Sequence, residues 1–172
     1  MVATNLTGGF LMMREVFLQS MQKHGGAIVN MAADMWNGMP GMGHSGAARA
    51  GMVNLTKTAA FEWAFAGVRV NCVAPGWIES SGLDRYEGAA KALIPTLKDH
   101  VPLKRLGTEA EVSAAICFLL SPAAAFITGV TLAIDGGAPL GNALFPMGNH
   151  SPAPRFDGFH RAAKPAVLDE GN

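Results

Sequence analysis

The sequence predicts an α/β fold in which about three parallel strands alternate with helices. Three short apolar segments have the length and composition of buried strands: residues 27–32 (AIVNMA), 68–74 (VRVNCVA) and 130–137 (VTLAIDGG). Apolar residues recur at helical spacing in the segments between them, and glycines mark the turns. Strands that are separated by helices connect through right-handed crossovers and therefore pair in parallel.

The first predicted helix spans residues 9–22 and ends at Gly25-Gly26. Its apolar positions recur every three or four residues: Phe10, Met13, Phe17 and Met21. A loop rich in methionine and glycine is expected over residues 34–43, and a long helix over about residues 45–66. The strand at 68–74 breaks at Pro75-Gly76 and turns alternate residues to one face: Val68, Val70, Cys72 and Ala74.

Residues 77–100 are less regular, and helix is expected only around residues 89–97. Thr108 and Glu111 then have the spacing of a capping box, in which a threonine N-cap precedes a glutamate by three residues. The helix behind this box should stop before Pro122 and bury one apolar face: Val112, Ala115, Ile116, Leu119 and Leu120. From Ala138 onward the chain is rich in Pro, Gly and Asn, which predicts an extended tail.

Composition indicates a single globular domain, since 172 residues with 49% hydrophobic side chains suffice for a sizeable core. Thirteen basic and thirteen acidic residues balance, so neither nucleic acid nor a membrane is an expected partner. Cys72 and Cys117 are expected to be buried thiols in a reducing compartment, which favours a cytoplasmic location. No metal site is expected, because the spacing of four histidines does not suggest one: His24, His100, His150 and His160.

The run from Ala48 to Gly76 resembles the active-site helix, the next strand and the nicotinamide-contacting loop of the short-chain dehydrogenase/reductase family. This resemblance implies that residues 1–137 form the C-terminal half of a Rossmann-type, doubly wound parallel sheet, and that residues 138–172 form the tail. Met1 aligns with the start of the family's fifth helix. No Gly-rich turn that would cradle a pyrophosphate follows a strand, so roughly the first 100 residues of the family fold are expected to be missing.

The resemblance places candidate catalytic residues on the first and second helices. Asn5 matches the family's active-site asparagine, which supports a proton-relay water by holding a kink in its helix; a second role for it is to cap a helix beginning near Gly8. Ser45 and Arg49 stand where the family has a tyrosine and a lysine, and their i, i+4 spacing keeps both on one helix face. Two alanines, Ala32 and Ala33, occupy the positions of the hydroxyl residues that follow the strand containing Asn30.

These departures from the family pattern change the expected chemistry. Arginine keeps the positive charge and the nicotinamide-ribose contact of the lysine but cannot release a proton. Serine is a poor acid near neutral pH, whereas an imidazole exchanges protons there, so His44 is the candidate for proton delivery. The alternative is that His44 only bonds to backbone at the start of its helix.

The resemblance also implies the residues that contact the cofactor, which is NAD or NADP. Asn30 and Arg49 belong to this set, together with the loop residues Pro75, Gly76, Ile78 and Ser80. In the family the backbone of this loop contacts the nicotinamide carboxamide, and a hydroxyl two or three residues later contacts the phosphates.

Two branches of the family are similar at Ser45 and Arg49: peroxisomal trans-2-enoyl-CoA reductases and bacterial citronellol/citronellal dehydrogenases. The serine is also similar to that of 2,4-dienoyl-CoA reductases. The expected function is therefore an NAD(P)-dependent oxidoreductase that acts on an enoyl-CoA or on a terpenoid alcohol or aldehyde, as a homo-oligomer (dimer or tetramer). Two alternatives stay open: an inactive half-domain that serves as an oligomerisation or regulatory partner, and a coenzyme-A or lipid-binding module.

Overall fold

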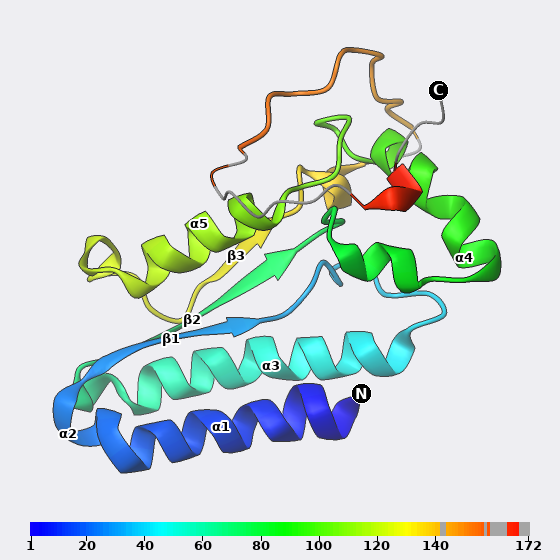
Figure 1. The fold of residues 1–172 in the computed structure, drawn as a ribbon. Helices are drawn as coiled ribbons and strands as arrows, with labels where there is room; N and C mark the ends of the chain where they lie inside the picture. The colour runs from blue at the N-terminus through cyan, green and yellow to red at the C-terminus, as the bar shows by residue number, and fades with distance from the viewer. Residues whose placement is uncertain (142–143, 157, 159–164, 169–172) are drawn as a thin grey trace. The chain divides into compact units, whose positions relative to one another are not determined.

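The computed structural model describes residues 1–141, 144–156, 158 and 165–168 (Figure 1). The chain divides into two compact units. The first comprises Met1–Pro75 and Ala115–Ala133, and the second comprises Gly76–Ala114 and Ile134–Asn172. Within the described residues, no helix combines the length and the apolar character that crossing a membrane requires.

A three-strand parallel sheet confirms the predicted fold class, with its strands in the order β1-β2-β3 (Figure 1). The strands are β1 (Gly26–Met31), β2 (Val68–Pro75) and β3 (Thr131–Ile134). The β1–β2 register runs from Gly26 opposite Val68 to Met31 opposite Val73. Each strand lies where an apolar run predicted it, and β1 forms one edge of the sheet.

Helical structure at the start of the chain begins earlier than predicted. It contains a π-helix at Ala3–Gly8, α1 (Gly9–Val16), a second π-helix at Phe17–Met21 and α2 (Gln22–His24). Asn5 therefore lies inside helical structure, and the prediction that it caps a helix beginning near Gly8 is wrong. Sequence periodicity missed the first turns because they precede the apolar repeat. Gly25 follows α2 with φ of 67°, which ends the helix as predicted.

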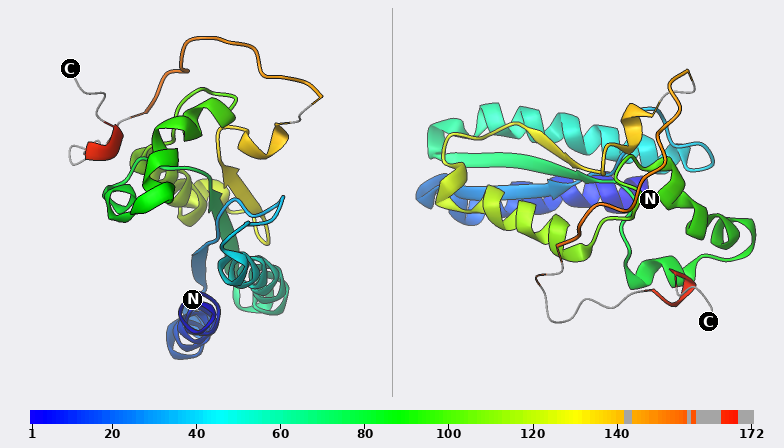
Figure 2. Two further views of the ribbon diagram at one scale, coloured as in Figure 1. Left: turned by 90° about the vertical axis from the view of Figure 1, so that its right-hand side faces the viewer. Right: turned by 90° about the horizontal axis from the view of Figure 1, so that it is seen from above.

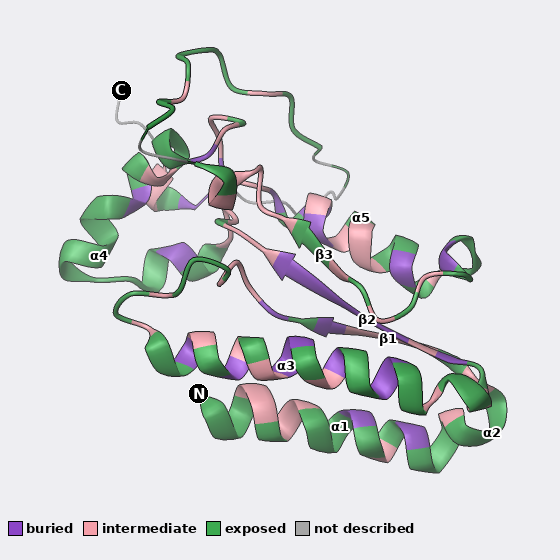
Figure 3. Cartoon of the chain, turned by 180° about the vertical axis from the view of Figure 1, so that it is seen from behind, coloured by how far each residue is buried: buried purple, intermediate pink, exposed green. Residues whose placement is uncertain are grey.

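The long helix α3 (Gly43–Glu62) packs on the sheet beside α1 (Figures 1 and 3). One core cluster joins Val68 and Val70 of β2 to residues of α1, the second π-helix and α3: Met13, Phe17, Met52, Ala59 and Ala60. A second cluster joins Cys72 and Ala74 to Ala32 and Val53. The face predicted for β2 is therefore buried, whereas Phe10 of the predicted helix face is exposed.

The opposite face of β2 is also buried, as expected of a central parallel strand. Asn71 is fully buried there, and its amide binds the Ile127 carbonyl and the Val130 N–H at 2.9 and 3.2 Å. The Arg69 guanidinium donates to the carbonyls of Leu119 and Ser121 at 2.8 and 3.2 Å, where α5 (Glu109–Leu120) ends. These two polar side chains bind the segment that leads from α5 to β3.

The burial of α5 only partly follows the prediction. Val112 and Leu119 are buried, whereas Leu120 is 46% exposed and Ala115 and Ile116 are half-buried. Cys117 is exposed, so the prediction of a second core thiol is wrong. Cys117 and Leu120 lie outside the narrow stripe that the helix buries. A helix has 3.6 residues per turn, which rotates positions 117 and 120 away from the buried positions 112 and 119.

The second unit is built from short helices. They are a 3₁₀ helix at Ser81–Arg85, α4 (Gly88–Leu93) and a 3₁₀ helix at Ile94–His100, which together include the helix predicted around residues 89–97. Leu83, Ile94 and Leu106 form their core, against which Leu97, Val167 and Leu168 pack. The described part of the chain after β3 has short 3₁₀ turns at Ala138–Leu140 and Ala166–Leu168.

Candidate active site

Helix α3 brings Arg49 to the carboxyl end of β1, where ligands bind in open α/β sheets. The Arg49 Nη1 donates to the Met31 carbonyl at 2.8 Å, and Met31 is the last residue of β1. Ser45 lies one turn earlier on α3 and is 6% exposed. Ser45 and Arg49 thus lie in the first half of α3. The N-terminal end of this helix is on the same side as the carboxyl ends of β1 and β2 (Figure 1).

Small residues let α3 lie close to its neighbours. Ala48, which precedes Arg49 on α3, is fully buried. A Cβ added at Gly51 would come within 2.8 Å of the Leu6 side chain, so glycine permits the approach of the first π-helix. Asn5 belongs to that π-helix and is half-buried. A π-helical turn at this position agrees with the helix irregularity that the family resemblance implies for Asn5.

Arg49 retains a donor for a ligand. Its Nε is buried and has no hydrogen-bond partner among the described residues. A buried donor left unpaired costs about 1–3 kcal/mol, so an acceptor from a bound molecule would stabilise this side chain. A ribose hydroxyl is such an acceptor. The residues present therefore fit the predicted contact between Arg49 and the nicotinamide ribose.

The structure shows a structural role for Asn30. Its Nδ2 donates to Thr56 Oγ1 at 2.9 Å, and the Thr56 hydroxyl donates to the Met52 carbonyl at 2.9 Å. Thr56 is fully buried and Asn30 is 9% exposed. This chain of bonds fastens β1 to α3. It holds the strand end and the Ser45–Arg49 turn in one register.

The remaining predicted residues of the first unit differ in exposure. His44 is exposed at the start of α3, where solvent reaches its ring. The Pro75 carbonyl accepts from the Asp34 N–H at 2.9 Å, which extends the pairing of β1 and β2 beyond the end of β1.

Burial raises the pKa of the Cys72 thiol, so this core cysteine stays protonated and unreactive.

The predicted loop residues Gly76, Ile78 and Ser80 belong to the second unit. A Cβ at Gly76 would lie 2.8 Å from the Cα of Asp135, the residue that follows β3. The close approach of this backbone therefore requires glycine at position 76. Ile78 forms a parallel bridge with Gly107, and the Glu79 N–H donates to the Gly107 carbonyl at 2.8 Å. The Ser80 carbonyl accepts from Leu83 at 2.9 Å and starts the following 3₁₀ helix.

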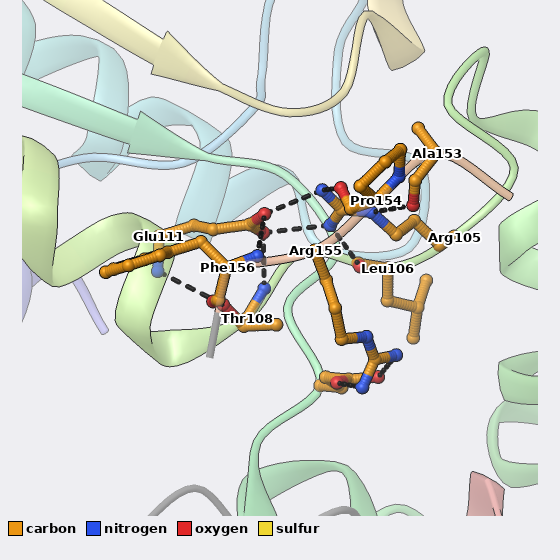
Figure 4. Close-up of polar contacts among 9 residues, drawn as sticks. Arg105, Leu106, Thr108, Glu111, Ala153, Pro154, Arg155 and Phe156 are labelled. Atoms are coloured by element: carbon orange, nitrogen blue, oxygen red, sulfur yellow. Dashed lines mark hydrogen bonds and ion pairs between the residues drawn. The ribbon is translucent and has the colours of Figure 1, made fainter. Parts of the chain in front are cut away.

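A polar network that the sequence predicted only in part belongs to the same unit as this loop (Figure 4). The capping box is confirmed, with the Glu111 N–H donating to Thr108 Oγ1 at 3.1 Å and Thr108 N–H donating to Glu111 Oε2 at 2.9 Å. Arg105 binds both carboxylate oxygens of Glu111 at 2.9 and 2.6 Å. Phe156 of the tail donates its N–H to Glu111 and accepts from the Thr108 hydroxyl.

The network sets the ionisation of Glu111. Burial raises the pKa of this carboxyl, but hydrogen bonds from Arg105, Thr108 and Phe156 together with the Arg105 charge lower it to about 2. Glu111 is therefore a fixed anion at neutral pH. The three-residue spacing of Thr108 and Glu111 predicted the bonds between them. Nothing in the sequence indicated that Arg105 and Phe156 of the tail also bind Glu111.

The described residues contain no group of three or more His, Cys, Asp or Glu side chains that could hold a metal ion. His160, one of the histidines considered in the sequence, lies outside the described residues.

Comparison with known proteins decides the family. The family model described as enoyl-(acyl carrier protein) reductase matches residues 1–139. The chain belongs to the short-chain dehydrogenase/reductase family. A probable 2,4-dienoyl-CoA reductase of Bacillus subtilis (strain 168) is 44% identical over 119 residues, which are 67% of this chain and 46% of that relative.

Solved structures of this family extend the comparison. The citronellol catabolism dehydrogenase AtuB of Pseudomonas aeruginosa PAO1 is 65% identical with a TM-score of 0.68, over 80% of this chain and 52% of that one. An ElxO variant with NADPH bound is 33% identical with a TM-score of 0.72, over 80% of this chain and 56% of that one. The chain spans about half the length of these relatives.

Proposed function

We propose that the protein carrying this chain is an NAD(P)-dependent oxidoreductase that acts on an acyclic terpenoid alcohol or aldehyde. The observation that carries the proposal is the Ser45–Arg49 turn at the end of β1, in a chain 65% identical to a citronellol catabolism dehydrogenase. Reduction of an enoyl-CoA is the second candidate, supported by 44% identity to a probable 2,4-dienoyl-CoA reductase.

Each site residue has a role in this proposal. The bound nicotinamide would supply or accept the hydride. Arg49 would bind the nicotinamide ribose through its ε N–H while its Nη1 stays on the Met31 carbonyl. The Ser45 hydroxyl would donate to the substrate oxygen and stabilise the negative charge that develops there. His44, exposed next to Ser45, would exchange the proton with solvent.

The loop after β2 would complete the cofactor site. We assign the nicotinamide contacts to the backbone of Pro75, Gly76 and Ile78, and a phosphate contact to the Ser80 hydroxyl. Asn5 would hold a relay water in its π-helical turn, and Asn30 would keep β1 on α3 through Thr56. We further propose that residues 1–137 are the C-terminal half of the family's Rossmann domain, that residues 138–172 are an extended tail, and that the protein is a cytoplasmic homo-oligomer.

The test uses the protein in which this chain is joined to a dinucleotide-binding half. Citronellol, citronellal and a trans-2-enoyl-CoA are each incubated with NAD(H) and NADP(H), and the absorbance of the reduced nicotinamide is followed. Turnover of citronellol or citronellal supports the leading proposal, and turnover of the thioester alone supports the second candidate. No turnover of any of them would support a non-catalytic half-domain instead.

Variants then test the site. Arg49→Ala removes charge-assisted hydrogen bonds worth about 1.5–3 kcal/mol, so the cofactor KM should rise about tenfold or more. Arg49→Lys should retain part of the affinity, because a point charge replaces the guanidinium. Arg14→Ala is the matched control, since Arg14 pairs with Glu15 on the exposed face of α1. Equal cofactor KM values for Arg49→Ala and Arg14→Ala would contradict the ribose contact.

A further inference from the structure

Within the second unit, the described stretch of the tail at residues 144–156 forms an arch whose end returns to the segment before α5 (Figure 2). The Ala153 N–H donates to the Leu103 carbonyl at 3.0 Å, and the Ala153 carbonyl accepts from Arg105 Nε at 3.0 Å. Because the family model matches only residues 1–139, these contacts lie outside the family match, which therefore assigns them no role.

Arg155 stands between two tail residues that are bonded to the core of this unit (Figure 4). The Pro154 carbonyl accepts from Arg105 Nη2 at 2.8 Å, and the Phe156 N–H donates to Glu111 at 3.2 Å. Bonds on both sides fix the backbone at Arg155. An ion pair made from this position therefore orders less main chain than one made from a free tail.

The Arg155 guanidinium binds both carboxylate oxygens of Glu79. Its Nη1 lies 2.6 Å from Oε1, and its Nη2 donates to Oε2 at 3.1 Å. The Glu79 side chain is only 9% exposed. Two parallel bonds to one carboxylate fix its orientation as well as balance its charge. Without this partner, a carboxylate so deeply buried would have to turn toward water to be solvated.

Glu79 belongs to the loop to which we assign cofactor contacts, since it lies between Ile78 and Ser80. On its main-chain side, the Glu79 N–H donates to the Gly107 carbonyl at 2.8 Å. The loop is thus held by a backbone bond to Gly107 and by the side-chain pair with Arg155. A Glu79 side chain that turned toward water would pull against the backbone bond.

We infer that Arg155 is a positioning residue for the cofactor loop. Through Glu79 it holds Ile78 and Ser80 in the conformation that contacts the nicotinamide and the phosphates. The inference rests on the proposed function, because that function assigns this loop to the cofactor. When the hold is released, the cofactor binds only the fraction of molecules in which the loop keeps this conformation, and its apparent affinity falls accordingly.

Amide hydrogen exchange without cofactor tests the hold on the loop, in the protein that joins this chain to a dinucleotide-binding half. Arg155→Ala should speed the exchange of residues 77–81 roughly tenfold or more, since it removes charge-assisted hydrogen bonds. Exchange in β2 should stay the same, which separates release of the loop from general unfolding. Arg155→Lys should keep part of the protection, because an ammonium still pairs with Glu79.

The matched control is Arg85→Ala, which removes an exposed arginine from the 3₁₀ helix that follows the loop. It should leave exchange at residues 77–81 unchanged. Equal exchange rates in Arg155→Ala and Arg85→Ala would overturn the inference.

Fluorescence titration with NADH and NADPH tests the consequence for the cofactor. Arg155→Ala should raise the cofactor Kd about threefold or more, with little change in kcat at saturating cofactor. In a Glu79→Gln background the same substitution should have a smaller effect, since no buried charge is then left unpaired. Equal Kd values for the wild-type protein and Arg155→Ala would overturn the positioning role. Absence of binding by the wild-type protein would instead contradict the proposed function, and the exchange rates would still decide whether the tail holds the loop.

Discussion

Replacing Glu111 with glutamine should destabilise the protein in a pH-dependent way. Glu111 accepts from Arg105, from the Thr108 N–H and from the Phe156 N–H. Glutamine has nearly the same shape and can still serve in a capping box, but it removes the negative charge that pairs with Arg105. The substitution therefore isolates the charge of Glu111 from its size.

The magnitude follows from the pKa of this carboxyl, which falls from an ordinary 4.5 to about 2 in the folded protein. A change of this size corresponds to about 3 kcal/mol of stability from ionisation. Because the unfolded chain holds the proton more tightly, stability rises with pH across this interval. The contribution is fully present above about pH 4.5 and is lost as the pH falls toward about 2.

Urea unfolding followed by circular dichroism gives the free energy of unfolding at several pH values. At about pH 7, Glu111→Gln should lower it by about 2–3 kcal/mol, and the deficit should shrink by about 1 kcal/mol by about pH 3.5. Glu109→Gln, in the same helical turn but exposed, is the matched control and should change stability little. A deficit that is the same at both pH values would refute the electrostatic explanation.

Three further outcomes follow from the structure. Asn30→Ala and Thr56→Val should each cost about 1–3 kcal/mol by leaving a buried polar partner, and their double variant should cost less than the sum; additivity in the double-mutant cycle would contradict the bond that fastens β1 to α3. The 172-residue chain alone should self-associate, because β1 is a sheet edge and Phe61 and Phe126 are largely exposed; a monodisperse monomer in sedimentation would contradict this. The same chain should bind NAD(P)H no tighter than about millimolar in a fluorescence titration, since it lacks a Gly-rich pyrophosphate loop; micromolar binding would show that the loop is dispensable.

Sequence reasoning succeeded where the determining interaction is local. The three strands followed from short apolar runs, and the run is longest for β2, because a strand buried on both faces has few polar positions. The capping box followed from the spacing of Thr108 and Glu111, since both partners lie within one helical turn. The i, i+4 relation of Ser45 and Arg49 is likewise fixed by helix geometry alone.

The predictions failed where an element extends beyond its apolar repeat or where distant segments pack against each other. The capping role predicted for Asn5 was wrong because helical structure continues upstream of the apolar repeat. Periodicity does not indicate which face of a helix meets a neighbour, so Leu120 and Cys117 were predicted buried and are exposed. The bond from Phe156 to Glu111 joins residues 45 positions apart, and no spacing rule predicts such a partner.

The substitution Ser45→Tyr tests the assigned catalytic turn most directly. If Ser45 and Arg49 form a working site without a tyrosine acid, a larger side chain at position 45 has little room, because Ser45 is only 6% exposed. Turnover of the native substrate is measured for Ser45→Tyr and Ser45→Ala in the protein with both halves of the fold. Ser45→Ala should lower turnover with little change in cofactor KM, and Ser45→Tyr should lower it further by filling the substrate space. A large gain in turnover on restoring tyrosine would contradict the account, because it would mark the site as a dehydrogenase that has lost its acid.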